Sequence, residues 1–188
     1  DSTVLLGELL ELLRYCFEQI DFIDEPVELG FDCPLGLHCT YTRDQLLVAM
    51  DFMKPSTVRE GVKWLPEKNI DVFFVTLNKA DKDYSPTTMY NDYSINESLF
   101  HWQSQSTTAE NSPTGQRYIH HKERGSKVLL FVREFKSDRV TGGAEAYTYL
   151  GTANYVKHTG SRPMNITWQL DRPIPAKFLK KTNKLVVG

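Results

Sequence analysis

The 188-residue sequence contains none of the short motifs that mark the most widespread catalytic folds. It has no glycine-rich phosphate loop, no G-x-S-x-G turn and no H-E-x-x-H metal motif. The common nucleotide hydrolase, serine hydrolase and metalloprotease functions therefore have no support. Asp92 and His101 could form a carboxylate–imidazole pair, but no nucleophile in a recognisable motif accompanies them. We expect a binding domain without catalytic activity.

Long apolar runs and paired cysteines are also missing. No run reaches the length of a membrane span, and the N-terminus lacks a basic region followed by an apolar block, so we expect a soluble, cytoplasmic protein with no membrane partner. Cys16, Cys33 and Cys39 are odd in number and lack C-x-x-C spacing. Neither a disulfide framework nor a zinc site is indicated, and we expect no cofactor. Because the first residue is Asp and not Met, we expect a piece of a longer protein.

The net charge of −2 conceals an uneven distribution of charge along the chain. Residues 1–100 hold 8 basic and 18 acidic side chains, whereas residues 101–188 hold 14 basic and 6 acidic side chains. Cations clustered on one surface attract phosphate even where the overall pI is low. The C-terminal part could therefore face a polyanion. The alternative is that the two halves neutralise each other across an internal interface.

The N-terminal part of the sequence predicts two helices. Apolar residues recur at helical spacing over residues 3–22 and form a wide stripe that needs a partner surface. Thr42 is placed as an N-cap and Gln45 as the third helical residue of a capping box, which predicts a short helix over residues 42–50. We expect both helices to pack outside a sheet formed by the rest of the chain.

Strand patterns dominate the sequence after residue 55. The run over residues 70–77 is β-branched and aromatic through its middle, which predicts burial on both faces. Further strands are expected over residues 61–65, 128–135, 147–151, 153–158 and 165–170. Short strands with glycine-rich turns are typical of a curled antiparallel sheet or barrel. The sequence therefore predicts an α+β fold, with a helical lead-in over residues 1–55 and a sheet domain over residues 56–188.

The stretch over residues 78–105 combines aromatic rings with amide and carboxylate groups. Flat apolar faces beside such polar tips suit a planar, polar ligand such as a nucleobase. The candidate base-binding residues are Tyr90, Asp92, Tyr93, Phe100, His101, Trp102, Gln103 and Ser104. The alternative is an ordinary core segment whose rings pack together. After it, residues 105–116 predict a long polar loop, and His120 and His121 are expected at a strand end.

Six short segments carry a resemblance to a known family. They read VTLNK at 75–79, YSPTTMYNDY at 84–93, LFHWQSQS at 99–106, LLFVRE at 129–134, YLG at 149–151 and GSRPMNI at 160–166. In this order they resemble the C-terminal domain of helicase-linked type IV, modification-dependent restriction enzymes. That resemblance implies a barrel-like sheet of the SRA/PUA type, which captures a modified cytosine such as 5-methylcytosine from double-stranded DNA by flipping it out of the duplex. It also implies nuclease and helicase domains in the parent chain.

The chemistry of the candidate residues indicates how such a base would be held. We expect Tyr90, Tyr93 or Trp102 to stack on the flipped base. Asp92 would accept a hydrogen bond from the cytosine N4 amino group, a donor that thymine lacks. Contacts with the DNA backbone are expected from Asn78, Lys79, Arg117, Lys122, Arg124, Lys127, Lys157 and Arg162. The alternative is a protein-interaction module whose N-terminal helix docks onto a helicase.

Overall fold

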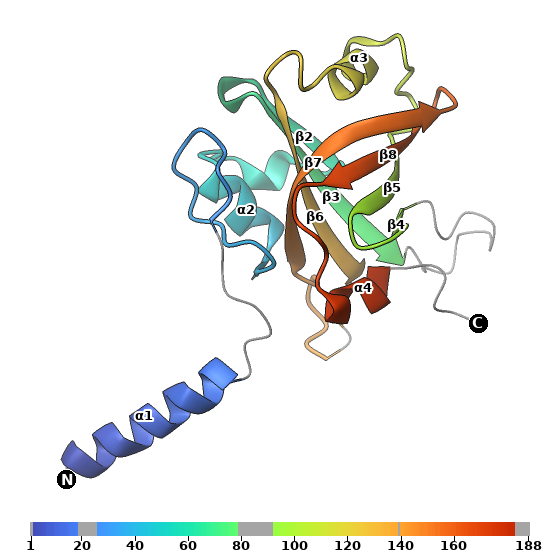
Figure 1. Ribbon diagram of the computed structural model, residues 1–188. Coiled ribbons are helices and arrows are strands. Elements are labelled where there is room, and N and C mark those ends of the chain that lie inside the picture. The colour runs from blue at the N-terminus through green and yellow to red at the C-terminus, as the bar shows by residue number, and fades with distance from the viewer. Residues whose placement is uncertain (1, 19–25, 79–91, 139, 183–188) are drawn as a thin grey trace.

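The computed structural model describes residues 2–18, 26–78, 92–138 and 140–182, and its centre is one eight-stranded sheet (Figure 1). The strands are β1 (Thr40–Tyr41), β2 (Val62–Leu65), β3 (Ile70–Asn78), β4 (Tyr93–Ser94), β5 (Leu99–Gln103), β6 (Lys127–Phe135), β7 (Tyr147–Thr159) and β8 (Asn165–Leu170). Their order is β2-β3-β6-β7-β8-β5-β4, and β1 pairs with β7. The prediction of an α+β fold is therefore confirmed.

The sheet is mixed, so the prediction of a purely antiparallel sheet is wrong at one place. Strands β3 and β6 are parallel, whereas the other pairs within the described residues are antiparallel. The connection between β3 and β6 carries β4, β5 and helix α3 (Pro113–Ile119). This connection places β4 and β5 at the far edge of the sheet before the chain returns to form β6 beside β3. Two parallel neighbouring strands require a long crossover of this kind.

The central strands are buried on both faces, as the sequence of residues 70–77 predicts. Phe73, Val75 and Leu77 belong to one apolar core, whereas Val72 and Phe74 belong to another on the opposite face. This separation follows from the two-residue period of a strand, which sends successive side chains to opposite faces. The hydrophobic pattern thus fixes which side of β3 each residue occupies.

The sheet curls so far that strands distant in its order touch each other. Phe73 of β3 stacks on Trp102 of β5 with 4.2 Å between ring centroids, although three strands separate β3 from β5. Trp168 of β8 and Tyr118 of α3 complete this aromatic cluster with edge-on contacts to Phe73. The two ends of the curled sheet, formed by β2 with β3 and by β4 with β5, therefore face one another across a seam.

Three short helices cover the curled sheet. Helix α2 (Arg43–Ala49) packs Leu46 and Leu47 into the core on the outer face, and Thr42 and Gln45 form the predicted capping box at its start. Helix α3 lies at one end of the sheet, and helix α4 (Ala176–Thr182) lies at the other (Figure 1). None of the described helices is long and apolar enough to cross a membrane.

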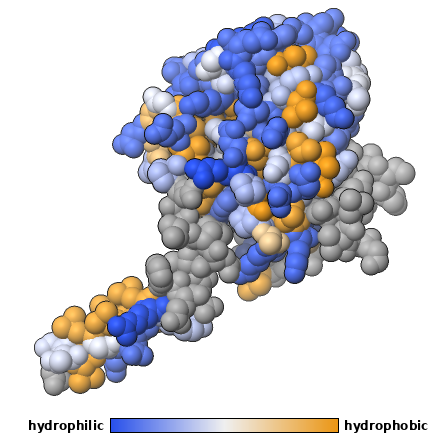
Figure 2. Space-filling view, viewed as in Figure 1, coloured by the Kyte–Doolittle hydropathy of each residue, from blue (hydrophilic) through white to orange (hydrophobic). Residues whose placement is uncertain are grey.

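Helix α1 (Ser2–Glu18) stands apart from the sheet (Figure 1). All its side chains from residue 2 to residue 15 are exposed, and Leu5, Leu9 and Leu13 are 50–66% accessible. The expectation that this helix packs outside the sheet is therefore wrong for these residues. Figure 2 shows apolar side chains gathered along one side of α1. The predicted stripe exists, but no described part of the chain covers it.

Helix α3 replaces part of the loop that the sequence predicts over residues 105–116. Ser112 caps the helix by accepting a hydrogen bond from the Gly115 amide at 3.0 Å, and Pro113 occupies its first turn. Gly115 is required because an added Cβ atom would lie 2.1 Å from the carbonyl oxygen of Ala109. His121 follows this helix, so the expected strand-end position of the histidine pair is wrong. Two favourable local signals, the cap and the proline, outweigh the low helix propensity of the segment.

Candidate functional site

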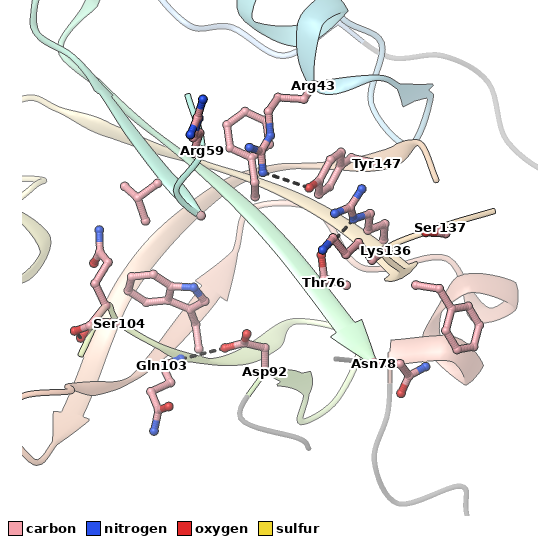
Figure 3. A pocket seen from close by; sticks show the side chains of 17 residues that line it. Arg43, Arg59, Thr76, Asn78, Asp92, Gln103, Ser104, Lys136, Ser137 and Tyr147 are labelled. Atoms are coloured by element: carbon pink, nitrogen blue, oxygen red, sulfur yellow. Dashed lines mark hydrogen bonds between the residues drawn. The ribbon is translucent and has the colours of Figure 1, made fainter. Parts of the chain in front are cut away.

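A cavity of about 690 Å³ opens at the seam between the two ends of the curled sheet (Figure 3). Strand β2 pairs only with residues 70–73 of β3, so the second half of β3 borders the cavity. Alternate residues of that half, Phe74, Thr76 and Asn78, line it. The segment just before β4 and the end of β5 form the opposite wall, which brings residues far apart in the sequence into one site.

One wall of the cavity is cationic. It contains Arg43 at the start of α2, Arg59 before β2, Arg133 in β6 and Lys136 just after β6. Arg59 and Lys136 are exposed, whereas Arg43 and Arg133 are partly buried. Asp92 is the one carboxylate among the described lining residues. The cavity therefore has an excess of positive charge and favours an anionic ligand.

Arg43 and Arg133 are held in place by neutral groups. Arg43 donates hydrogen bonds to the Val58 carbonyl at 2.9 Å and to the Tyr147 hydroxyl at 3.3 Å. Arg133 donates from Nε to the Thr76 hydroxyl at 2.9 Å, and its guanidinium carbon lies 4.5 Å from the ring centroid of Tyr147. Neither arginine forms an ion pair within the part of the chain that the structure describes. Burial, with a smaller contribution from nearby Arg43, lowers the pKa of Arg133, although a guanidinium remains charged.

The opposite wall is polar and carries Asp92 and two residues at the end of β5. Asp92 is buried, and its Oδ1 accepts a hydrogen bond from the Gln103 amide at 2.9 Å. Ser104 accepts from the Met164 amide at 2.9 Å, which ties the end of β5 to the loop before β8. Both hydrogen bonds fix the positions of groups that border the cavity, and Figure 3 shows the one between Asp92 and Gln103.

The predicted base-binding residues fall into two sets, of which one lines the cavity. Asp92, Trp102, Gln103 and Ser104 line the cavity, whereas Tyr93, Phe100 and His101 do not line it. Tyr90 lies outside the described residues. The expected single cluster is therefore only partly assembled.

The three remaining residues have other surroundings. Phe100 is fully buried in the core. His101 stacks on Tyr93 with centroids 4.8 Å apart, away from that core. Trp102 borders the cavity, but it is only 4% exposed and one of its faces is covered by Phe73. Its ring is therefore foremost a core element, as the alternative interpretation of this stretch holds.

The predicted DNA-backbone residues are dispersed over the surface. Asn78 lines the cavity, and Lys79 lies outside the described residues. Lys127 pairs in register with Ile70 at the start of the parallel strands, six residues along β3 from Thr76. At about 3.3 Å per residue that position is roughly 20 Å away. The other four exposed cations also lie outside the cavity lining, namely Lys122, Arg124, Lys157 and Arg162.

Arg117 is engaged inside the protein. Its Nε and one terminal nitrogen donate to the two carboxylate oxygens of Asp71 at 2.7 and 2.9 Å. Asp71 is fully buried, and the guanidinium carbon of Arg117 also lies 4.4 Å from the ring centroid of Trp64. We therefore assign Arg117 to the stability of the fold rather than to the predicted phosphate contact, because leaving Asp71 unpaired would carry a large cost.

The four cations that line the cavity are not among the site residues that the sequence predicts. Three of them come from loops or element ends, where a basic residue carries no positional signal. Arg133 offered the one usable signal, since it directly follows the apolar run over residues 128–132 in the same strand, and a charge beside such a run needs a specific partner. In the structure its partners are the Thr76 hydroxyl, the Glu145 carbonyl and the ring of Tyr147.

No group of three or more histidine, cysteine, aspartate or glutamate side chains within the described ranges could hold a metal ion.

Comparison with known proteins places the chain in a family. No curated protein matches the sequence. A family model described as a domain of unknown function (DUF3427) matches residues 35–181, which is most of the chain and includes every residue that lines the cavity. The chain therefore belongs to the DUF3427 family.

Proposed function

We propose that this domain is a non-catalytic module that binds double-stranded DNA and receives a flipped, modified cytosine in the cavity at the seam. The observation that supports this most is the division of the cavity into a cationic wall and a wall with Asp92 and Gln103. A nucleotide has the same division, because its phosphate is anionic and its base edge carries donors and acceptors. The cavity volume lies within the range of about 300–1,000 Å³ that is usual for ligand sites.

Asp92 is the residue best suited to recognise the base. Its carboxylate accepts a hydrogen bond from the Gln103 amide, and a carboxylate has about four acceptor positions. It can therefore accept from a cytosine N4 amino group while the bond to Gln103 persists. Thymine presents a carbonyl oxygen at that place and would be repelled. Asp92 would thus select cytosine.

The preference for a modified cytosine is supported by the sequence resemblance to modification-dependent restriction enzymes. An apolar recess for one methyl group contributes roughly 0.8 kcal/mol, so the domain should prefer 5-methylcytosine only several-fold. In the parent protein we propose that this module directs nuclease and helicase domains to modified DNA. Hydrolysis of ATP and cleavage would belong to those domains.

The substitution Asp92→Asn tests this function sharply. Asparagine keeps an oxygen that can accept from Gln103, so the fold should persist, but its amide group would face the N4 amino group as a second donor. Fluorescence anisotropy with paired duplexes that differ by one 5-methylcytosine should show a several-fold preference in the original protein and none in the variant. Thermal melting of both proteins provides the folding control. A folded variant with unchanged discrimination would remove Asp92 from base recognition.

A second candidate function is supported by helix α1. Its apolar side carries Leu5, Leu6, Leu9, Leu10 and Leu13, and each of these leucines is at least 50% exposed. An apolar surface of this kind is typical of a protein interface. This favours docking of the helix onto a neighbouring domain, such as the helicase.

The two functions separate in one experiment. The substitution Leu9→Lys places a charge in the middle of the apolar side of α1. It should abolish docking to a helicase domain and leave DNA affinity unchanged. A loss of DNA affinity instead would show that α1 takes part in DNA binding.

A further inference from the structure

Two guanidinium groups in the cavity converge on one buried tyrosine. Tyr147 is 2% exposed, its hydroxyl accepts from Arg43 at 3.3 Å, and its ring lies under the guanidinium of Arg133 at 4.5 Å. Arg43 is also stacked over Phe74 at 4.7 Å. Each guanidinium is therefore fixed by a ring and by neutral acceptors before any ligand arrives. Such fixed donors lose little conformational freedom when they bind an anion.

Neither arginine of this pair forms an ion pair within the described part of the molecule. Glu145, just before β7, acts electrostatically on Arg133, but its carboxylate accepts a hydrogen bond from the Phe135 amide at 2.5 Å, and its backbone carbonyl accepts the hydrogen bond from Arg133. Asp92 lies on the opposite wall (Figure 3). Two partly buried cations close to each other repel one another more strongly than they would in water. An anion that bridges them would relieve this repulsion.

From this geometry we infer that Arg43 and Arg133 form a clamp for one tetrahedral phosphate group. A guanidinium offers paired donors that match two oxygens of a phosphate, so two guanidinium groups can bind all the oxygens that a phosphate group exposes. Arg59 and Lys136 at the rim would contact adjoining phosphates. The identification of this phosphate as that of the flipped nucleotide rests on the proposed function, whereas the clamp itself does not.

Inorganic phosphate is the probe that tests the clamp alone. At pH 8 and constant ionic strength, nuclear magnetic resonance should show a saturable shift of the terminal Nη–H signal of Arg133 as phosphate replaces chloride, because the Nε–H of Arg133 already donates to Thr76. The terminal Nη–H signal of Arg117 is an internal control, because that guanidinium already donates to both carboxylate oxygens of Asp71. If the Arg133 signal does not move, or if the Arg117 signal moves equally, the clamp is refuted on the unaltered protein.

Substitutions extend the test. The double variant Arg43→Met/Arg133→Met keeps apolar stems over the two rings and should weaken phosphate binding by about tenfold or more. Arg124→Met is the matched control, since Arg124 is an exposed arginine outside the cavity, and it should change nothing. If the double variant fails to fold, Arg43→Lys keeps the charge but loses the paired donors, and it should still weaken binding. Unchanged phosphate affinity in a folded clamp variant would contradict the inference.

Different experimental results would contradict the clamp and the proposed function. Binding of phosphate that depends on Arg43 and Arg133, without binding of DNA, would support the clamp and overturn the DNA-binding proposal. Unchanged affinity of the folded double variant for phosphate and for both duplexes, with methylated DNA still preferred over plain DNA, would overturn the clamp and leave the proposed function standing. If both hold, the double variant should weaken methylated and plain duplexes alike and reduce the salt dependence of binding by about one phosphate contact.

Discussion

Replacement of Arg117 by methionine should destabilise the domain strongly and should not weaken phosphate contacts. The carboxylate of Asp71 is fully buried and receives two hydrogen bonds from Arg117, at 2.7 and 2.9 Å. Loss of the guanidinium leaves this charge unpaired, and removal of one partner from a buried pair typically costs about 3–5 kcal/mol. The stem of methionine can still pack against Trp64, so the missing pair dominates the cost.

The pH dependence of this variant has a defined sign. Burial already raises the pKa of Asp71, while Arg117 opposes that rise. Without Arg117 the pKa of the folded state should rise further above the unfolded value of about 3.9. The stability of the variant should therefore be highest at acidic pH and decline as the pH rises through the folded-state pKa of Asp71. The double variant Asp71→Leu/Arg117→Met, which has no buried charge at this place, should recover most of the loss.

Urea denaturation followed by circular dichroism measures these free energies of unfolding. DNA affinity is measured in parallel at a temperature where the variants remain folded. A cost below about 1 kcal/mol for Arg117→Met, together with reduced DNA affinity and a smaller salt slope, would refute this reasoning. It would return Arg117 to the DNA-contacting surface that the sequence suggests.

Three other sites give sharp expectations. Tyr149→Phe should raise the free energy of unfolding by about 1 kcal/mol in a urea titration, because the buried hydroxyl has no hydrogen-bond partner among the described residues. Burial lowers the pKa of His121, whose ring accepts from the Tyr155 amide at 3.0 Å, so stability should decline as the pH falls below about 6.5, and His121→Gln should reduce that decline. Gly115→Ala should cost about 1–3 kcal/mol in thermal melts because its Cβ atom would overlap the Ala109 carbonyl, whereas an unchanged melting temperature would contradict the packing of α3.

The parts of the fold that the sequence predicts are those in which local chemistry and tertiary packing agree. The apolar run over residues 70–77 forms β3, and both faces of this strand meet a core. Thr42 and Gln45 form the capping box at the start of α2, as their spacing in the sequence predicts. The parallel pairing of β3 with β6 was not predictable in this way. It depends on where the chain goes between the two strands, and strand periodicity carries no information about direction.

The cavity was harder to predict than the fold. One of its walls lies within the predicted stretch, since Asp92, Gln103 and Ser104 border it. The cationic wall combines residues from four separate segments, and only the curl of the sheet brings Arg43 and Arg133 to the same tyrosine. The charge balance of the C-terminal part pointed to cations, but it could not separate those paired internally, such as Arg117, from those that face a ligand.

The central claim, that the seam cavity is the DNA-binding site, is tested most directly by two matched charge reversals. Arg59→Glu/Lys136→Glu changes two exposed cations that line the cavity, and Lys122→Glu/Arg124→Glu changes two exposed cations outside it. Anisotropy titrations of a methylated duplex over a range of salt concentrations should show weaker binding for the first pair, with the salt slope lower by about two, and unchanged binding for the second pair. Loss of binding in the second pair, with the first pair unaffected, would contradict the claim.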